Sequence, residues 1–152
     1  MGRASRGVIG IKLTTGDELA GVVAIQDDET LLTITENGYG KRTEAEEFSV
    51  HGRGTKGQIA YGCNSRTGEV VGVLSVGEGA EVIIITSQGQ TVRIASDAIS
   101  LQGRGAMGVR AVNIDKPDFV VGVDRSADED EGADEGADQA TDEDADENDE
   151  NE

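Results

Sequence analysis

The chain has 152 residues and one cysteine, with 31 acidic against 13 basic residues and a net charge of −18. A single cysteine excludes an intramolecular disulfide, and the sequence has neither an apolar signal region at its N-terminus nor a run of apolar residues long enough to span a membrane. These features exclude disulfide-stapled and membrane-spanning proteins and predict a cytoplasmic protein without membrane partners.

The charge is unevenly distributed along the chain. Residues 126–152 hold 15 of the acidic residues and no Lys or Arg, which leaves the first 125 residues only mildly acidic. Like charges at this density repel one another and cannot offset the conformational entropy of ordering. We therefore predict a folded region over 1–125 and a disordered acidic tail over 126–152. Arg outnumbers Lys by 9 to 4, so a salt-accumulating source and an ordinary acidic tail both remain open as explanations.

A repeat of about 50 residues organises the folded region. Gly-Arg-x-x-x-Gly units begin at residues 2, 52 and 103, which are 50 and 51 residues apart. A second anchor agrees, because 34–39 aligns with 85–90 and brings Arg42 onto Arg93. A third anchor consists of Gly21, Gly72 and Gly122, each at the start of a run of β-branched residues. Three anchors at one period indicate a true repeat.

The first repeat predicts four strands, at 8–13, 19–25, 31–35 and 39–43, because each run is short and rich in β-branched residues. Asn37-Gly38 predicts a hairpin between the last two, with a type I′ turn in which both residues have positive φ. The connections at 43–50 and 93–101 have room for a short turn of helix. No long amphipathic helix is predicted.

A period near 50 with four strands per unit predicts an all-β fold, a partial β-propeller or β-pinwheel of four-stranded blades. The chain holds two complete units, 7–50 and 57–101, and a half unit over 108–124, so the ring cannot close. We expect that it is part of a longer disc or that it self-associates to cover exposed blade edges. A truncated gene, a misassigned start and a split subunit would each explain this count.

The glycine-rich units at 52–57 and 103–108 also match the Gly-x-Gly-x-x-Gly pattern of dinucleotide-binding proteins, which needs a helix directly after it. The following residues are short and β-like, so we expect inter-blade turns and no bound cofactor. Basic residues on these turns would lie at matching places around the array, where they could meet phosphates. Ordinary surface charge is the alternative interpretation.

The Gly-Arg-x-x-x-Gly units at this period, with Thr35-Glu36-Asn37-Gly38-Tyr39-Gly40-Lys41-Arg42-Thr43 between two of them, resemble the C-terminal domain of the DNA gyrase A protein over residues 1–125. The resemblance places the chain on the last two to three blades. It implies a pinwheel of about six blades in the full gyrase A, which wraps double-stranded DNA during ATP-dependent negative supercoiling. The partners that it implies are the remainder of gyrase A and the gyrase B subunit. It further implies a chromosome-associated location, with ATP and Mg²⁺ bound by other parts of the enzyme.

Two departures from the family limit the function expected of this chain. The family's Gln-Arg-Arg-Gly-Gly-Lys-Gly box has no full counterpart, since its nearest match, at 51–57, keeps only four of the seven residues, and this argues against autonomous wrapping. The breakage-reunion domain is not in this sequence, and Tyr39 and Tyr61 lie at a predicted hairpin and strand. His51 has no second histidine for a metal site. We therefore expect no catalytic, cofactor-binding or metal-binding residues here.

The DNA-binding role predicts contacts from basic residues of the repeat anchors. The candidates are Arg3, Arg6, Lys41, Arg42, Arg53, Lys56, Arg93, Arg104 and Arg110. The 15 carboxylates of the tail could compete with DNA for these residues. The alternative function is a stand-alone DNA-binding or protein-binding blade module without topoisomerase activity.

Overall fold

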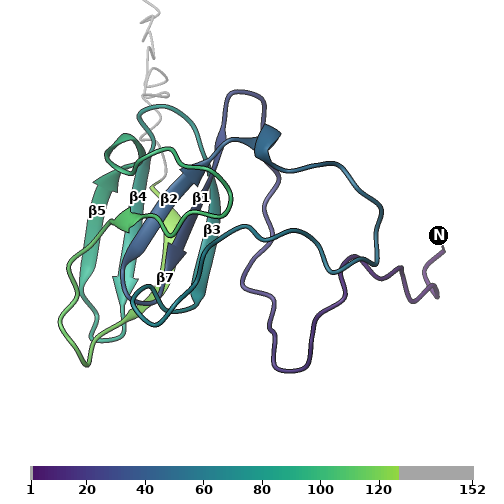
Figure 1. The fold of residues 1–152 in the computed structure, drawn as a ribbon, viewed down its shortest axis with the longest axis horizontal. Helices are drawn as coiled ribbons and strands as arrows, with labels where there is room; N and C mark the ends of the chain where they lie inside the picture. The colour runs from purple at the N-terminus through teal and green to yellow at the C-terminus, as the bar shows by residue number, and fades with distance from the viewer. Residues whose placement is uncertain (1, 127–152) are drawn as a thin grey trace, which may run out of the picture.

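The computed structural model describes residues 2–126, and over this range the protein is all-β (Figure 1). Two one-turn helices, η1 (Ala45–Glu47) and η2 (Ser96–Ala98), confirm the short helical turns predicted in the connections. The predicted acidic tail lies, from residue 127 onward, outside the described range. The strands are β1 (Thr30–Thr35), β2 (Tyr39–Thr43), β3 (Val70–Val76), β4 (Glu81–Thr86), β5 (Thr91–Ala95), β6 (Val109–Arg110) and β7 (Val120–Arg125).

The strands form two antiparallel sheets that draw on different repeats. The first sheet has the order β3-β1-β2-β6, and the second has the order β5-β4-β7. In the first sheet, Ile34 of β1 pairs with Gly72 of β3, and in the second, Ile85 of β4 pairs with Gly122 of β7. The same pairing therefore occurs twice: the hairpin of one repeat pairs with a strand from the next repeat.

This exchange corrects the prediction that each unit forms its own four-stranded sheet. The central hairpin of the first sheet comes from the first repeat, β3 comes from the second, and β6 comes from the third. The predicted strands at 31–35 and 39–43 are confirmed as β1 and β2. The predicted strands at 8–13 and 19–25 are wrong, because no strand is assigned among residues 2–29. Residues 19–25 correspond by the repeat spacing to β3, but they are not paired with a hairpin in the described structure.

The hairpin between β1 and β2 is confirmed, but its turn differs from the predicted type I′. The amide of Gly38 donates to the carbonyl of Thr35 at 3.0 Å, so residues 36–38 form a three-residue loop. Gly38 has a φ of 79°, whereas Asp28 is the one non-glycine residue with positive φ in the described range. Asn37 therefore keeps a negative φ, and the left-handed residue is the glycine alone.

The core lies between the two sheets, where β3 and β7 pack together. Gly72 of β3 faces the Val123 side chain so closely that a Cβ at this position would collide with it. Alternation along β4 buries every second residue, as expected for a strand with one face on a core, whereas β1 is buried without interruption from Leu32 to Thr35. The buried apolar residues are Leu32, Ile34, Val76, Val82, Ile84, Ile99, Val112 and Val120.

Two long segments, residues 2–29 and 48–62, extend from the sheets toward the N-terminus (Figure 1). They contact each other through a single parallel bridge between Ile11 and Thr55. The amide of Lys12 donates to the carbonyl of Thr55 at 2.8 Å, and the amide of Gly54 donates to the carbonyl of Gly10 at 2.9 Å. Neither helical turn in the described part of the chain is long or apolar enough to cross a membrane.

Candidate nucleic-acid interface

Three basic side chains gather around Tyr39, at the start of β2. We call Tyr39, Arg66, Arg110 and Lys116 the Tyr39 cluster. The guanidinium carbons of Arg66 and Arg110 lie 5.3 Å and 5.5 Å from the centroid of the Tyr39 ring. An open cavity of about 220 Å³ lies here, and Lys116 is among the residues that line it. An aromatic ring with two guanidinium groups close to it is an arrangement suited to a phosphate or another polyanion.

The fold brings these residues together from separate parts of the chain. Arg110 lies on β6 directly opposite Tyr39, because β6 is the edge strand next to β2. Arg66 belongs to the turn before β3, and its carbonyl accepts a hydrogen bond of 3.1 Å from the Asn37 side chain in the hairpin loop. Lys116 lies in the connection between β6 and β7. The strand exchange between repeats thus assembles the cluster.

Electrostatics couple Tyr39 and Arg110. A guanidinium nitrogen of Arg110 donates to the Tyr39 hydroxyl at 3.1 Å. This hydrogen bond lowers the pKa of the Tyr39 phenol and raises the pKa of Arg110. Both shifts favour a cationic Arg110 held in place by the phenol oxygen. The guanidinium therefore has a fixed position at the cavity rather than a freely rotating one.

One carboxylate, Asp118, also lines the cavity. It accepts hydrogen bonds from the Ser87 hydroxyl at 2.7 Å and from the amides of Gln88 and Phe119 at 3.0 Å and 2.9 Å. Burial acts to raise the pKa of Asp118, but these donors outweigh it and the pKa is lowered. Asp118 therefore stays charged, and it is already hydrogen-bonded to donors of the neighbouring loop. The cavity thus has three cationic side chains and one carboxylate whose hydrogen bonds are made elsewhere.

Several predicted contact residues have structural partners instead. Lys41 is fully buried, and its ammonium donates to the carbonyls of Gly103 (2.8 Å) and Arg104. It cannot reach a phosphate in this structure, which argues against its predicted direct contact. Arg104 donates to the carbonyl of Ile59 at 3.1 Å.

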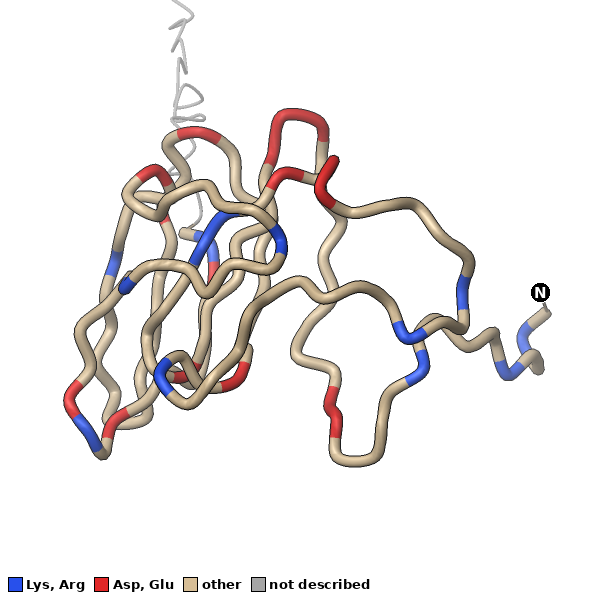
Figure 2. The backbone as a smooth tube through the Cα atoms, in the orientation of Figure 1, with Lys and Arg blue, Asp and Glu red and all other residues tan. Residues whose placement is uncertain are grey.

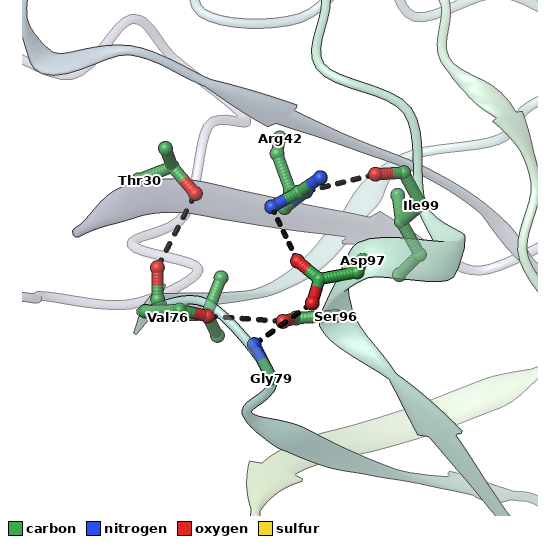
Figure 3. Close-up of polar contacts among 8 residues, drawn as sticks. Thr30, Arg42, Val76, Gly79, Ser96, Asp97 and Ile99 are labelled. Carbon is green, nitrogen blue, oxygen red and sulfur yellow. Dashed lines mark hydrogen bonds and ion pairs between the residues drawn. The ribbon is translucent and has the colours of Figure 1, made fainter. Parts of the chain in front are cut away.

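Arg42 forms a clamp between β2 and the segment after β5 (Figure 3). Its Nε donates to the carbonyl of Ile99 at 2.8 Å, and its guanidinium pairs with Asp97 at 3.1 Å. The same carboxylate accepts the amide of Gly79 at 2.8 Å. Arg93, at the equivalent place in the next repeat, is exposed and pairs with Glu81 at 3.1 Å. Both arginines are therefore ion-paired.

The remaining candidates lie on the two long segments, away from the sheets. Arg3, Arg6, Arg53 and Lys56 are all exposed. Figure 2 shows the basic stretches of these segments on the side of the molecule that carries the N-terminus. Of the nine predicted residues, Arg110 is the one that belongs to the Tyr39 cluster.

Arg66 and Lys116 are cluster members that the sequence interpretation missed. Each stands six residues before a glycine of the repeat anchors, Gly72 and Gly122 respectively. This shared offset is the signal that could have identified them. Their sequence surroundings are otherwise unlike, since Arg66 lies in an Asn-Ser-Arg-Thr-Gly turn and Lys116 precedes a proline.

Neither tyrosine has the setting of a nucleophile. Tyr61 is buried, its hydroxyl donates to the carbonyl of Met107, and burial raises its pKa to about 12. Tyr39 has its hydroxyl bound to Arg110 and no general base among its hydrogen-bond partners in the described part of the chain.

Comparison with known proteins gives one consistent family. The family described as DNA gyrase C-terminal domain, beta-propeller, matches residues 1–26, 29–76 and 80–127. The DNA gyrase A protein of Mycolicibacterium smegmatis is 39% identical over 133 residues, which is 88% of this chain and 16% of that protein. The DNA gyrase A protein of Haloquadratum walsbyi is 40% identical, over 82% of this chain and 15% of that protein. The chain thus spans about a sixth of the length of these relatives.

Solved structures agree with the fold. The structure of a DNA gyrase A C-terminal domain superposes with a TM-score of 0.74 at 31% identity, covering 79% of this chain and 41% of that one. The C-terminal domain of a DNA topoisomerase IV superposes with a TM-score of 0.59 at 22% identity, over 70% of this chain and 32% of that one, and supports the fold alone. The match within residues 1–127 confirms the predicted resemblance: the chain belongs to the DNA gyrase C-terminal domain family of β-propellers.

Proposed function

We propose that this chain binds double-stranded DNA as a blade segment of a type II DNA topoisomerase of the gyrase kind. Its partners would be the remainder of gyrase A and the gyrase B subunit, on the chromosome in the cytoplasm. The observation that carries the proposal is the Tyr39 cluster, in which two arginines and a lysine meet at one cavity. ATP and Mg²⁺ would act elsewhere in the enzyme, and this chain would contribute the DNA-bending surface.

The cluster would bind the phosphate backbone rather than bases. Arginine side chains stacked on an aromatic ring present their outer N–H groups to phosphate oxygens, which fixes the position of the duplex without reading its sequence. The exposed basic residues of the long segments would add contacts that depend on charge alone. Bending 20 to 30 base pairs through 40 to 90° costs about 1 to 6 kcal/mol, so wrapping requires contacts on more than one blade.

The salt dependence of duplex binding tests the proposal. The Arg66→Ala/Arg110→Ala double variant should bind linear duplex more weakly and lose about 2 from the slope of log affinity against log salt, because each phosphate contact contributes roughly 0.9. Arg93→Ala is the matched control, since this exposed arginine is already paired with Glu81. Its slope should stay near that of the parent protein. Thermal unfolding of each variant checks that the sheets are intact.

An unchanged slope in the double variant would rule out the cluster as a phosphate site. If no variant or parent protein binds duplex at low salt, the alternative of a protein-binding blade module is favoured. Ligation of DNA minicircles in the presence of the chain separates wrapping from simple binding, because wrapping changes the linking number and simple binding does not.

A further inference from the structure

Arg66 lies at the Tyr39 cluster without a polar partner for its guanidinium. The guanidinium carbon lies 5.3 Å from the centroid of the Tyr39 ring, and within residues 2–126 the group makes no hydrogen bond or ion pair. Arg110, by contrast, is anchored by its hydrogen bond to the Tyr39 hydroxyl. Arg66 is exposed, and its long side chain has several rotatable bonds. Its position at the cavity therefore depends on how its backbone is held.

Two asparagine side chains hold the backbone on either side of Arg66. The side-chain oxygen of Asn64 accepts the amide of Arg66 at 2.8 Å and the amide of Thr67 at 3.1 Å. The carbonyl of Arg66 accepts the side-chain amide of Asn37 at 3.1 Å. The first asparagine thus acts as an acceptor and the second as a donor. Because the carbonyl of Arg66 and the amide of Thr67 belong to one planar peptide group, that group is restrained from both sides.

The backbone of the same turn is docked on the hairpin loop between β1 and β2. The amide of Asn37 donates to the carbonyl of Thr67 at 3.2 Å, and the amide of Glu36 donates to the carbonyl of Glu69 at 2.9 Å. Thr67 is fully buried in this contact between the first and second repeats. These backbone bonds do not use the asparagine side chains. Substitutions of the side chains can therefore change the orientation of Arg66 while the sheets stay folded.

The second hairpin loop is docked without an asparagine pair. The amide of Ser87 donates to the carbonyl of Phe119 at 2.8 Å, which repeats the bond between Glu36 and Glu69 one repeat later. The added side-chain bonds come here from the carboxylate of Asp118. By the repeat spacing, a glutamine and an isoleucine stand where the first docked turn has its two asparagines. Backbone docking is thus common to both repeats, and the asparagine pair is specific to the turn that carries an arginine.

We infer that Asn37 and Asn64 are positioning residues, which orient Arg66 over the Tyr39 ring as a contact for phosphates of the DNA backbone. This inference rests on the proposed DNA binding at the Tyr39 cluster. A cation whose direction is fixed before binding loses less conformational freedom when it meets a phosphate. Neither asparagine needs to touch the phosphate. Their contribution to binding passes through Arg66.

Aspartate at the two positions makes the same change in charge and size but should have opposite effects. Asn64→Asp keeps an oxygen that accepts the amides of Arg66 and Thr67, so Arg66 should stay in place. Asn37→Asp has no donor for the carbonyl of Arg66, so Arg66 should leave the ring. The slope of log affinity against log salt for linear duplex should therefore fall by about 0.9 in Asn37→Asp and stay at the parent value in Asn64→Asp. Asn64→Ala, which removes the acceptor, should behave like Asn37→Asp.

Two further measurements show whether the effect passes through Arg66. In the free chain, the ring current of Tyr39 should shift the NMR resonances of the Arg66 side chain in the parent protein and in Asn64→Asp, and this shift should be lost in Asn37→Asp. In an Arg66→Ala background, Asn37→Asp and Asn64→Asp should bind duplex with the same affinity, because the group that distinguishes them is gone. Circular dichroism of every variant checks that the sheets persist.

The inference is overturned if Asn37→Asp keeps the parent slope while Arg66→Ala lowers it, or if the Arg66 resonances keep their shift in Asn37→Asp. Equal weakening by Asn37→Asp and Asn64→Asp would also overturn it, because the added charge alone would explain the loss. An Arg66→Ala protein that binds duplex like its parent is a separate result. It contradicts the proposed phosphate contact itself, and with it the role inferred for the two asparagines.

Discussion

Lys41 is a basic residue whose role lies inside the protein. Its ammonium donates to two backbone carbonyls of the 103–108 loop and lies 5.1 Å from the centroid of the Tyr61 ring. Burial lowers its pKa, and the nearby charge of Glu47 partly opposes this shift. The side chain fastens the loop of the third repeat to β2 of the first. A lysine next to Arg42 in sequence therefore joins repeats, although its residue type alone is typical of a phosphate contact.

Substitution of Lys41 should reduce stability more than substitution of an exposed lysine. Lys41→Met keeps most of the volume but leaves the carbonyls of Gly103 and Arg104 without their donor, and we expect a loss of about 1 to 3 kcal/mol in the free energy of unfolding. Lys41→Ala adds a cavity and should cost about 2 to 5 kcal/mol. Lys12→Ala, on an exposed segment, should change stability by about 0.5 kcal/mol or less. Urea denaturation measures all three, and a Lys41→Met protein as stable as its parent would contradict this role.

The buried phenol of Tyr61 should make stability fall at alkaline pH. Its pKa is raised to about 12, so the folded state retains a proton that the unfolded state loses near pH 10. Its contribution is complete below about pH 10 and disappears as the pH rises toward 12. Lys41 acts in the opposite sense, because its lowered pKa makes stability rise with pH just below the ordinary lysine value. A variant that removes only the phenolic hydroxyl of Tyr61 separates the pH effect of Tyr61 from that of Lys41.

Tyr61→Phe is that variant. Near neutral pH it should be less stable than the parent protein by about 1 kcal/mol, because the Met107 carbonyl loses its donor. At about pH 11 this difference should shrink by about 1 kcal/mol or reverse, since phenylalanine does not titrate. Chemical denaturation at both pH values provides the measurement. A difference that does not change with pH would show that Tyr61 titrates normally in the folded protein.

At the scale of elements, the two hairpins have the same turn but different surroundings. Gly38 and Gly89 both have left-handed backbone, with φ of 79° and 82°. A Cβ on Gly38 would lie 2.6 Å from the carbonyl oxygen of Val112, whereas a Cβ on Gly89 meets nothing within 4 Å. The carbonyl of Gly38 also accepts the amides of Ala111 and Val112. The first turn is thus packed against the segment of the third repeat that follows β6, and the second turn is open.

Alanine at these two glycines should separate backbone strain from crowding. Gly89→Ala should cost about 1 to 2 kcal/mol, the penalty of a left-handed alanine. Gly38→Ala carries the same penalty and must also displace the backbone at Val112, so we expect an additional loss of about 1 to 3 kcal/mol. Thermal and urea unfolding give the comparison. Equal losses at the two positions would mean that the Val112 segment moves aside without cost.

The β1–β2 hairpin was predictable because neighbouring residues determine its turn and strands. The pairing of strands between repeats was not predictable, because it depends on which repeat supplies each strand. Asn37-Gly38 marks a turn locally, and the run of Thr and Ile before it marks a strand. The period shows that Gly21, Gly72 and Gly122 are equivalent, but it does not say which repeat each one pairs with. Burial of Lys41 was also inaccessible, because the loop that covers it lies about 60 residues later in the chain. The Tyr39 cluster depends on the same long-range contacts.

At the scale of the whole molecule, charge is separated along the sequence. The first 125 residues are mildly acidic with 13 bases, and the tail adds 15 carboxylates to a chain whose proposed DNA-binding surface depends on cations. A tethered segment has an effective concentration in the mM range, so even weak contacts of the tail with the basic loops would compete with the proposed DNA binding. Salt weakens such contacts, because at about 1 M the Debye length is only about 3 Å.

Removal of residues 126–152 tests this competition. If the tail competes, the shortened chain should bind duplex about two- to tenfold more tightly at low salt, and the difference should vanish at about 1 M salt. Fluorescence anisotropy with labelled duplex gives both affinities. A tail of the same length with Ser and Gly in place of Asp and Glu controls for bulk. If low-salt affinity is the same with and without the acidic tail, the tail serves solubility instead.

The exchange of strands between repeats also bears on how such an array changes length. The β1–β2 hairpin pairs with strands of the two repeats that follow it. Both hairpins use the same register toward the next repeat, as the pairs Ile34 with Gly72 and Ile85 with Gly122 show. Unequal recombination between two equivalent glycine codons would therefore add or remove one blade and leave every internal pairing intact. Any unmatched strand would arise at the two ends of the array. Blade number can thus vary between genes without any change to the residues that hold neighbouring blades together.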